Sequence, residues 1–427
     1  MKQTEIGEIP EDWQISDLKS VTTLIQNGLF FEPKRKGKGI PLINVGDMYK
    51  SSPIAVEELD LFDANSTEKN IYKVKDGDLL FTRSSIVPSG IAFCNVYFED
   101  SKNIDVVFDS HLIKATPKSE LVDSKYLYLN CTSKVARNYF VSVSKSAIMT
   151  TIDQQGIRNC PVLLPPRQEQ KNISTVLADT DNLIQATEQL INKKQLIKTA
   201  TMQNLLTGKI RLAEFDTKKT KPSELGEIPS DWDVVKLKEI TQVKSGGTPS
   251  TNSSDFWNGN INWCTPTDIT KLQGRKYLEK TQRTISQLGL QFSSAEVLPI
   301  GSIVMTSRAT IGECAITTTL MTTNQGFKNF ICHDEVYNEF LYYLLGTQKQ
   351  RFINLCSGST FLEISTTQVQ NFSIVIPKSK KEQIAIANIL MDIDKELGIL
   401  NQRLTKLNDI KQGLMQDLLT GKIRLTE

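Results

Sequence analysis

Residues that commonly hold metals or move protons are scarce in this chain. Its 427 residues include two histidines, His111 and His333, and seven cysteines, none of which forms a Cys-x-x-Cys pair. No zinc-type ligand set has a recognisable spacing, and little acid/base chemistry by histidine is available. We therefore expect no metal site and no cofactor, and we expect most cysteines to be small buried hydrophobic residues.

Long apolar runs are also absent, and charge of one sign does not dominate. The N-terminal segment MKQTEIGEIPEDW is polar, so the sequence predicts neither a membrane span nor a signal peptide and indicates a cytoplasmic protein. Lysine and arginine number 50 against 48 acidic residues, which gives a formal net charge of +2. Any binding of nucleic acid must then rely on local basic patches, because the chain as a whole has no strongly basic field.

An internal duplication organises the sequence. The segment IGEIPEDW, residues 6–13, returns as LGEIPSDW, residues 225–232, and we call these two segments the leads. MQNLLTGKIRLAE, residues 202–214, returns as MQDLLTGKIRLTE, residues 415–427, and we call these the tails. The leads differ at two of eight positions and the tails at two of thirteen. The chain therefore consists of two halves of similar length, each of which opens on a lead and closes on a tail.

Each half contains a globular region followed by a long helical pattern. GDLLFTRSSIVPSGIAFC, from Gly77, corresponds to GSIVMTSRATIGECAI, from Gly301, and both indicate a buried strand, a polar turn and a second strand. Each region has roughly 150 residues, an ordinary size for one domain. We predict an α+β protein in which two similar globular domains alternate with two long α-helices. The predicted segments are 1–164, 165–215, a charged linker at 216–223, 224–376 and 377–427.

The two helical patterns differ in their hydrophobic stripes. From Ile386 onward, apolar residues recur in alternating steps of four and three, which is typical of a coiled coil. The first helix has a broader stripe that polar residues dilute, which indicates contact with more than one neighbour. Helices of about 40 residues would be about 60 Å long, and Gly208 and Gly421 would end them. Their mutual orientation stays open from the residues alone. The predicted partner-binding positions are Leu183, Leu190, Ile197, Leu205, Leu397, Leu404 and Leu418.

Several segments together resemble one known family. They are the leads, the run KSGGTPSTNSSDFWNGNINWCTPTDIT from Lys244, the turn MTSRATIGECAI, TTNQGFKNF from Thr322, CSGSTFLEIS from Cys356 and the tails. In this order they are similar, over essentially the whole chain, to the specificity subunit of type I restriction-modification enzymes. The resemblance implies two target-recognition domains, each of which reads one half of a split, asymmetric sequence in double-stranded DNA. It also implies that the helices pair antiparallel, hold the domains apart and dock two methyltransferase subunits, through which restriction subunits join.

The chain lacks the motifs that catalysis in such a complex would need. Adenine methylation by this route uses an Asn/Asp-Pro-Pro-aromatic motif and a glycine-containing loop for the methyl donor, and the sequence has neither. The Gly-Lys pairs at 208 and 421 are followed by isoleucine, so they do not form a phosphate-binding loop. We expect a non-catalytic subunit with no catalytic residues.

The polar turn of each half is the leading candidate for contact with DNA. DNA reading needs donors for phosphates and forked or amide side chains for base edges. In the second half Arg308 follows Thr306 and Ser307, and in the first half Arg83 and Ser84 hold the equivalent turn. An arginine in such a turn is also a common structural ion-pair partner, but we favour DNA contact.

Loops supply the remaining DNA-binding candidates. The first half departs more from the family pattern: DSHLIKA, from Asp109, replaces NQGFKNF, and a basic loop replaces the glycine-rich SGGTPS. That basic loop suits phosphate contact but is equally typical of a solvated face. The candidates are Lys34, Arg35, Lys36, Lys38 and Lys145 in the first half, and Thr248, Ser359 and Thr360 in the second.

A function of a different class stays open from the residues. The globular regions of a duplicated protein can bind protein ligands while its helices oligomerise, which would make the chain a structural adaptor without DNA-binding activity. Retention of duplex DNA in the presence of a methyltransferase partner separates the two interpretations.

Overall fold

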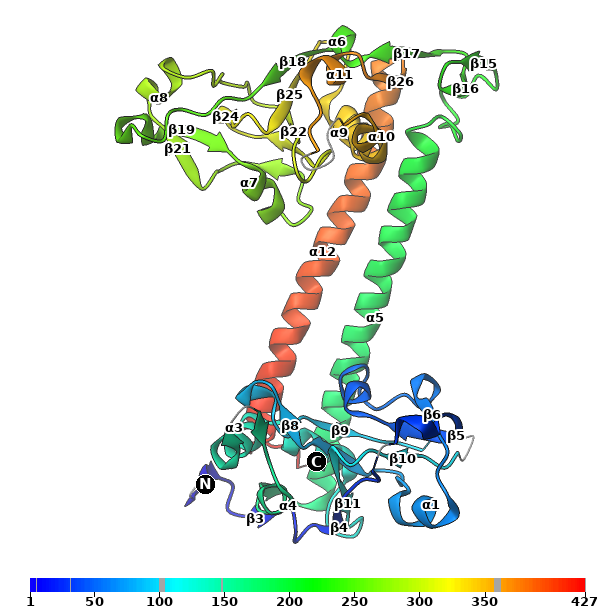
Figure 1. Ribbon diagram of the computed structural model, residues 1–427, viewed down its shortest axis with the longest axis vertical. Helices are drawn as coiled ribbons and strands as arrows, with labels where there is room; N and C mark the ends of the chain where they lie inside the picture. The colour runs from blue at the N-terminus through cyan, green and yellow to red at the C-terminus, as the bar shows by residue number, and fades with distance from the viewer. Residues whose placement is uncertain (5, 31, 100–103, 147–148, 357–361, 427) are drawn as a thin grey trace. The chain divides into compact units, whose positions relative to one another are not determined.

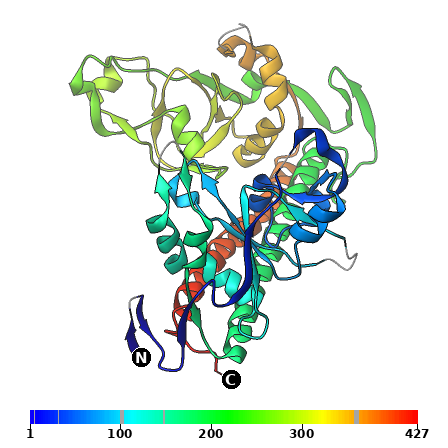
Figure 2. The ribbon, with the colours of Figure 1, turned by 60° about the horizontal axis from the view of Figure 1, so that its bottom comes forward.

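The computed structural model describes residues 1–426 except 5, 31, 100–103, 147–148 and 357–361. Contacts divide the chain into unit 1, Met1–Glu188 with Gln402–Glu427, and unit 2, Gln189–Asn401. Each unit contains one globular region and part of each long helix, α5 (Arg167–Leu205) and α12 (Lys380–Leu418) (Figure 1). Both chain ends belong to unit 1 (Figure 2). Among the described residues, no helix combines the length and the apolar character that a membrane span requires.

The central sheet of unit 1 is buried on both faces. Its strand order is β4-β11-β7-β9, with antiparallel neighbours throughout. Alternate residues of the run Leu79–Thr82 enter different cores, since Phe81 packs with the helices while Leu80 packs toward the second sheet. This explains why the sequence shows a continuous apolar run there. The strands are β4 (Thr22–Asn27), β7 (Leu79–Thr82), β9 (Cys94–Val96) and β11 (Leu112–Pro117).

Smaller sheets and short helices complete the globular region of unit 1. The strands form a three-stranded sheet β10-β5-β6, a three-stranded sheet β12-β13-β8, and the pairs β1-β2 and β14-β3. Their bounds are β1 (Lys2–Thr4), β2 (Gly7–Ile9), β3 (Gln14–Asp17), β5 (Lys36–Ile43), β6 (Asp60–Phe62), β8 (Ser84–Ser85), β10 (Val107–Phe108), β12 (Lys145–Ser146), β13 (Thr150–Thr151) and β14 (Pro161–Leu164). The helices are α1 (Ser66–Tyr72), α2 (Ser124–Thr132), α3 (Lys134–Val143) and α4 (Gln154–Arg158).

Unit 2 repeats the same plan, with one more strand in its central sheet. Its central sheet has the order β18-β25-β22-β23-β20, in which the first four strands correspond to β4-β11-β7-β9. These strands are β18 (Thr241–Ser245), β20 (Tyr277–Leu278), β22 (Ile303–Thr306), β23 (Cys314–Thr317) and β25 (Phe327–Cys332). A three-stranded sheet β21-β19-β24 lies beyond it, with β19 (Trp257–Cys264), β21 (Arg283–Ile285) and β24 (Met321–Thr323). The duplication expected from the sequence is thus present in the strand topology.

The remaining elements of unit 2 frame this sheet. The helices are α6 (Leu237–Ile240), α7 (Pro266–Lys271), α8 (Gln287–Gln291), α9 (Asn338–Thr347), α10 (Lys349–Leu355) and α11 (Thr366–Gln370). Strand β17 (Trp232–Lys236) pairs with β26 (Ser373–Pro377). Strand β15 (Thr220–Ser223) pairs with β16 (Gly226–Pro229), so half of the expected linker 216–223 forms one arm of a hairpin.

The two long helices pack antiparallel within each unit. In unit 1 the first turns of α5 share a core with the last turns of α12, where Ile173 and Leu177 lie with Leu418. In unit 2 the end of α5 meets the start of α12, where Leu205 lies with Ile386. Opposite ends of the helices therefore meet in both units, as the family resemblance implied.

The buried stripe of α5 differs from the expected one. Leu205 and Leu418 are buried and Leu397 and Leu404 are half-buried, whereas Leu183, Leu190 and Ile197 are each about two-fifths exposed. Thr187 and Ile191 are buried instead. The Thr187 hydroxyl donates to the carbonyl of Leu183 at 2.7 Å, so its polar group is satisfied within the helix.

A cluster that we call the clasp closes unit 1 around the second tail. Arg424 Nε donates to Glu169 Oε1 at 2.8 Å, and Arg424 Nη2 donates to Asp12 Oδ2 at 2.7 Å. The indole N–H of Trp13 donates to the other Glu169 oxygen at 3.0 Å. The lead, the start of α5 and the tail are therefore joined by one arginine.

Unit 2 contains the same clasp built from the first tail. Arg211 Nε donates to Glu382 Oε1 at 2.7 Å, and Arg211 Nη1 donates to Asp231 Oδ1 at 2.9 Å. Trp232 donates to Glu382 Oε2 at 3.3 Å. The repeated leads and tails thus have an intramolecular reason to stay alike, because each tail closes on the lead of its own unit.

Gly421 shows why the tails carry a glycine at this point. It adopts a φ of +71°, and a Cβ there would lie 2.4 Å from Cγ of Pro10 in the lead. Gly208 has the same conformation in unit 2, with a φ of +70° and Pro229 beside it. The two glycines follow the ends of α12 and α5, as predicted.

Candidate nucleic-acid interface

In unit 1 the backbone after β7 is held on two sides. Arg83 N donates to the carbonyl of His111, and Ile152 N donates to the carbonyl of Arg83, both at 3.0 Å. His111 N in turn donates to Oδ1 of Asp109 at 2.7 Å. Arg83 and Ser84, the turn of unit 1, are therefore presented by a backbone that neighbouring segments fix.

The same frame recurs in unit 2 with different residues. Ser307 N donates to the carbonyl of Gly326 at 2.8 Å, and Ile364 N donates to the carbonyl of Ser307 at 3.2 Å. Gly326 N donates to Oδ1 of Asn324 at 2.9 Å. Ser307 and Arg308, the turn of unit 2, thus occupy the positions of Arg83 and Ser84.

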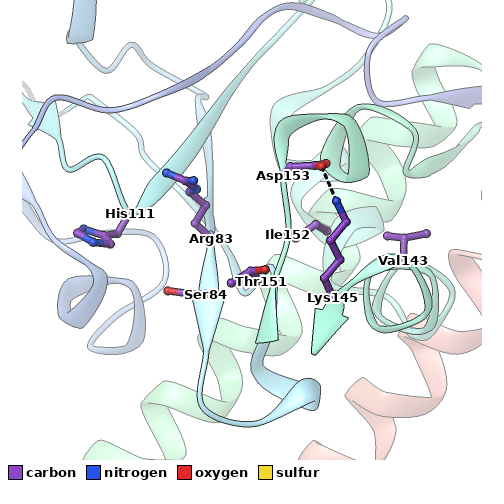
Figure 3. A pocket seen from close by; sticks show the side chains of 8 residues that line it. All are labelled: Arg83, Ser84, His111, Val143, Lys145, Thr151, Ile152 and Asp153. Carbon is purple, nitrogen blue, oxygen red and sulfur yellow. Dashed lines mark ion pairs between the residues drawn. The ribbon is translucent and has the colours of Figure 1, made fainter. Parts of the chain in front are cut away.

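Residues far apart in the first half come together around the turn of unit 1 (Figure 3). They enclose a cavity of about 370 Å³. Arg83, Ser84 and Lys145, which the sequence singled out, all line it. The other lining residues are His111, Val143, Thr151, Ile152 and Asp153.

The charged side chains of this cavity are accessible to solvent. Arg83 is exposed, and within the described residues its guanidinium has only a long hydrogen bond, 3.4 Å from Nη1 to the carbonyl of Ser110. Lys145 Nζ lies 3.6 Å from Oδ2 of Asp153, and both side chains are mostly exposed. His111 Nδ1 lies 2.6 Å from Oδ1 of the buried Asp109. The cavity therefore offers a fork, an ammonium and a ring nitrogen to an anionic or base-edge ligand.

Only one side chain of the Thr306-Ser307-Arg308 turn reaches solvent. Thr306 and Ser307 are fully buried, and the Thr306 hydroxyl donates to the carbonyl of Thr310. Arg308 is 46% exposed, and its Nε lies 3.0 Å from Oε1 of Glu363. The expectation that Thr306 and Ser307 face DNA is thus corrected: both lie beneath the surface and support Arg308.

The glycine-rich segment of the second half packs closely against the same frame. A Cβ on Gly246 would lie 2.0 Å from the carbonyl oxygen of Asn324, so only glycine allows this approach. The Thr248 hydroxyl donates to Oε1 of Gln325, which places Thr248 beside the turn of unit 2. Ser359 and Thr360 lie outside the described residues.

Acidic neighbours neutralise most of the basic loop. Arg35 pairs with Glu68 and donates to the carbonyl of Asp63, while its guanidinium lies 4.6 Å from the ring centre of Phe62. Lys36 pairs with Asp60 at 2.7 Å and Lys38 with Asp63 at 3.0 Å. Glu68 raises the pKa of Arg35 through a hydrogen bond. Arg35 is thus part of the fold, and Lys34 alone of the four has no ion pair among the described residues.

Sequence reasoning missed the partners of the turns. His111, Thr151 and Asp153 surround Arg83, and Glu363 faces Arg308. A signal was present, because DSHLIKA and NQGFKNF place Asp109 and Asn324 two residues before His111 and Gly326. Both acceptors form the same short-range turn, which aligns the two segments residue by residue.

Buried cysteines belong to the cores. Cys94, Cys131, Cys160 and Cys264 are buried, and the other three are half-buried. Burial raises the pKa of the Cys94 thiol. Among the described residues no cluster of histidine, cysteine, aspartate and glutamate is arranged to hold a metal ion.

Comparisons with known proteins agree with this geometry. The family model of the type I restriction modification DNA specificity domain matches residues 10–194 and again 229–409. Over 200 residues the chain is 37% identical to the type I restriction enzyme MjaIX specificity subunit of Methanocaldococcus jannaschii, covering 46% of this chain and 45% of that protein. Over 473 residues it is 22% identical to the HindI specificity subunit of Haemophilus influenzae, covering 96% and 100%.

The fold also matches solved structures. A chain from a structural study of complex assembly and conformational transition in a type I R-M system has a TM-score of 0.60 and 15% identity, covering 97% of this chain and 100% of that one. The two family matches together span most of the sequence, one in each half. The chain belongs to the type I restriction-modification DNA specificity family. It is a specificity subunit with two DNA specificity domains, one in each unit.

Proposed function

We propose that the chain is a non-catalytic subunit that reads a bipartite, asymmetric target in double-stranded DNA. Each unit reads one half-site, and the paired helices set the gap between them. The observation that carries this proposal is the shared frame. Two turns with the same backbone hydrogen bonds present Arg83 and Ser84 in one unit and Ser307 and Arg308 in the other. Because the two turns share a backbone frame but carry different side chains, they suit two different half-sites.

The charge of the chain is consistent with DNA contact through a few local groups. The chain has a formal net charge of only +2, so phosphate contact must come from local groups such as Arg83 and Lys145. Few such groups are free of acidic neighbours, because most of the basic loop is paired. We infer that tight binding of DNA requires other subunits to enclose the duplex.

We also propose that α5 and α12 dock two methyltransferase subunits, through which restriction subunits join. Leu190 and Ile197 are spaced by seven residues in unit 2, so they share one side of α5, and they are 41% and 42% exposed. Leu183 has a similar exposure in unit 1. An apolar helix face of this kind suits a hydrophobic partner surface better than water.

Domain exchange tests the proposal. Residues 224–376 are replaced by the corresponding region of another family member, and the methylated motif is determined by sequencing DNA modified by the reconstituted complex. We expect one half of the motif to change and the other half and the spacer to stay. A change in both halves contradicts the assignment of one half-site to each unit. A wild-type complex that shows no sequence-dependent retention of duplexes would support the adaptor instead.

A further inference from the structure

Arg308 and Glu363 form an exposed cross-strand pair in unit 2. The two residues form an isolated antiparallel bridge, with Arg308 Nε 3.0 Å from Glu363 Oε1. Their side chains are 46% and 40% exposed. Among the described residues no hydrogen bond from the two terminal amino groups of the guanidinium is found, so both are available as donors.

The pair is not needed to hold the frame. In unit 1 the equivalent bridge joins Ser84 to Thr151, with the same backbone pairing and no charge on either residue. An ion pair this exposed contributes little to folding, because water screens it. The fold therefore tolerates neutral residues at both positions, and stability alone gives no reason for the charged pair.

Buried polar groups lie beneath the pair. Lys328 is 5% exposed, has no ion pair among the described residues, and donates only a long 3.4 Å hydrogen bond to the Ser245 hydroxyl. Burial lowers its pKa, the charge of Glu363 raises it and that of Arg308 lowers it. The buried hydroxyl of Ser307 has no hydrogen-bond partner in the part of the chain that the structure describes. The floor of this turn is thus polar and incompletely satisfied in the free protein.

The carboxylate of Glu363 distinguishes contact with a DNA phosphate from contact with a base edge. A lone arginine suits a phosphate, but a carboxylate 3.0 Å away repels one. Base edges reverse that preference, because guanine offers the O6 and N7 acceptors to a guanidinium fork and cytosine offers its N4 amino group to a carboxylate. An arginine beside a glutamate therefore matches G·C chemistry better than backbone chemistry.

We propose that Arg308 and Glu363 together specify a G·C base pair in the half-site that unit 2 reads. Arg308 donates to guanine O6 and N7, while Glu363 orients the guanidinium through Nε and accepts from cytosine N4 with its second oxygen. This inference rests on the proposed function, and it adds Glu363 as a specificity-determining residue. Ser84 and Thr151 predict a different base at the corresponding position of the other half-site.

The test uses the complete complex with its methyltransferase partner. The half-site of unit 2 is first assigned by the exchange of residues 224–376. Binding is then measured at fixed salt to duplexes in which each base pair of that half-site is changed in turn. The variants are Glu363→Thr, which copies Thr151, and Arg308→Lys, which keeps the charge but loses the fork. Glu313→Gln is the matched control, because Glu313 forms an equally exposed ion pair with Lys349 in the same unit.

We expect wild type to prefer G·C at one position by about ten-fold or more, and both variants to lose that preference without changing the others. Glu313→Gln should keep it. The inference is overturned if the half-site of unit 2 contains no G·C pair, if both variants keep the wild-type preferences, or if they weaken all duplexes equally. Arg308→Lys decides alone if Glu363→Thr does not fold. A wild-type complex with no base preference at all would instead overturn the proposed function.

Discussion

Removal of the clasp arginine should destabilise one unit and spare the other. Glu169 is 1% exposed, and Arg424→Ala would leave its carboxylate with only two hydrogen bonds, from Trp13 and from the backbone N–H of Leu425. Truncating one partner of a buried pair costs roughly 3–5 kcal/mol. Arg424 is 29% exposed and the two remaining donors persist, so we expect a loss of about 2–3 kcal/mol in unit 1.

The equivalent change in unit 2 should cost more. Arg211 is 5% exposed and Glu382 is 2% exposed, so water screens this pair less. We expect Arg211→Ala to reach the full range of about 3–5 kcal/mol. Asp12→Asn, at the half-exposed edge of the first clasp, should cost less than Arg424→Ala.

Native-state hydrogen exchange read by mass spectrometry suits this prediction, because its peptides report each unit separately. Arg424→Ala should accelerate exchange in residues 1–188 and 402–427 and leave 189–401 unchanged, and Arg211→Ala should do the reverse. Equal acceleration in both units, or an Asp12→Asn effect as large as that of Arg424→Ala, would refute the reasoning.

Acid should affect the two clasps in opposite directions. Burial raises the pKa of Glu169, but the hydrogen bonds from Arg424, Trp13 and Leu425 outweigh it and leave the pKa lowered. The stability that Glu169 contributes is thus present above its unfolded pKa and is lost as pH falls through its lowered folded value. Burial dominates at Glu382 and raises its pKa, so its ionisation opposes folding and that penalty disappears as pH falls. Protection factors, which correct each exchange rate for the intrinsic pH dependence of amide exchange, should therefore fall first in unit 1 as pH is lowered, and an earlier fall in unit 2 would contradict this.

Three further changes test other parts of the fold. Gly421→Ala should destabilise unit 1 by more than about 1 kcal/mol because φ is positive and Pro10 is close, whereas Gly398→Ala, open on a helix, should stabilise unit 2 by about 0.5–1 kcal/mol in denaturant unfolding. Lys114→Met should lower the free energy of unfolding by about 3–5 kcal/mol, because it leaves the buried carboxylate of Asp78 without its cation. Adding Asp78→Ser should recover much of that loss, and purely additive effects of the two substitutions would argue against their coupling. Deleting seven residues from each long helix should shorten the unread spacer by about 10 Å, or about three base pairs, and an unchanged spacer would exclude the helices as its determinant.

The sequence indicated the large features of the fold, because repeats and hydrophobic periodicity can be recognised from residues that are close together in the chain. The leads, the tails and the heptads predicted two halves with long helices, and Gly208 and Gly421 predicted the helix ends. On α5, Leu183 belongs to the expected stripe and is two-fifths exposed, whereas Thr187, one of the polar residues that dilute the stripe, is buried. A threonine that bonds its own helix counts as polar in a pattern but packs as a small apolar residue.

Site residues were predictable only where one short segment carries them. The strand-turn-strand pattern identified Arg83 and Arg308 without any partner. The pairing of Arg35 with Glu68 was not predictable, because the acidic residue is 33 positions away and a helix and a strand bring it back. Glu363 was missed for the same reason, 55 positions from Arg308. Which acidic residue pairs with a given arginine depends on tertiary contacts, and these cannot be inferred from the charges near the arginine in the sequence.

The duplication separates what the two halves share from what they vary. The tails stay alike because Arg211 and Arg424 each close a clasp within their own unit, so their similarity does not by itself require a common partner. The turns are held by backbone hydrogen bonds and, in the neighbouring segments, by the acceptors Asp109 and Asn324, so the frame places no demand on the side chains of the turns themselves. Side chains on that frame are therefore free to differ without loss of the fold. The buried clasp and the exposed turn thus explain how one architecture can keep its assembly constant while each unit acquires its own DNA half-site.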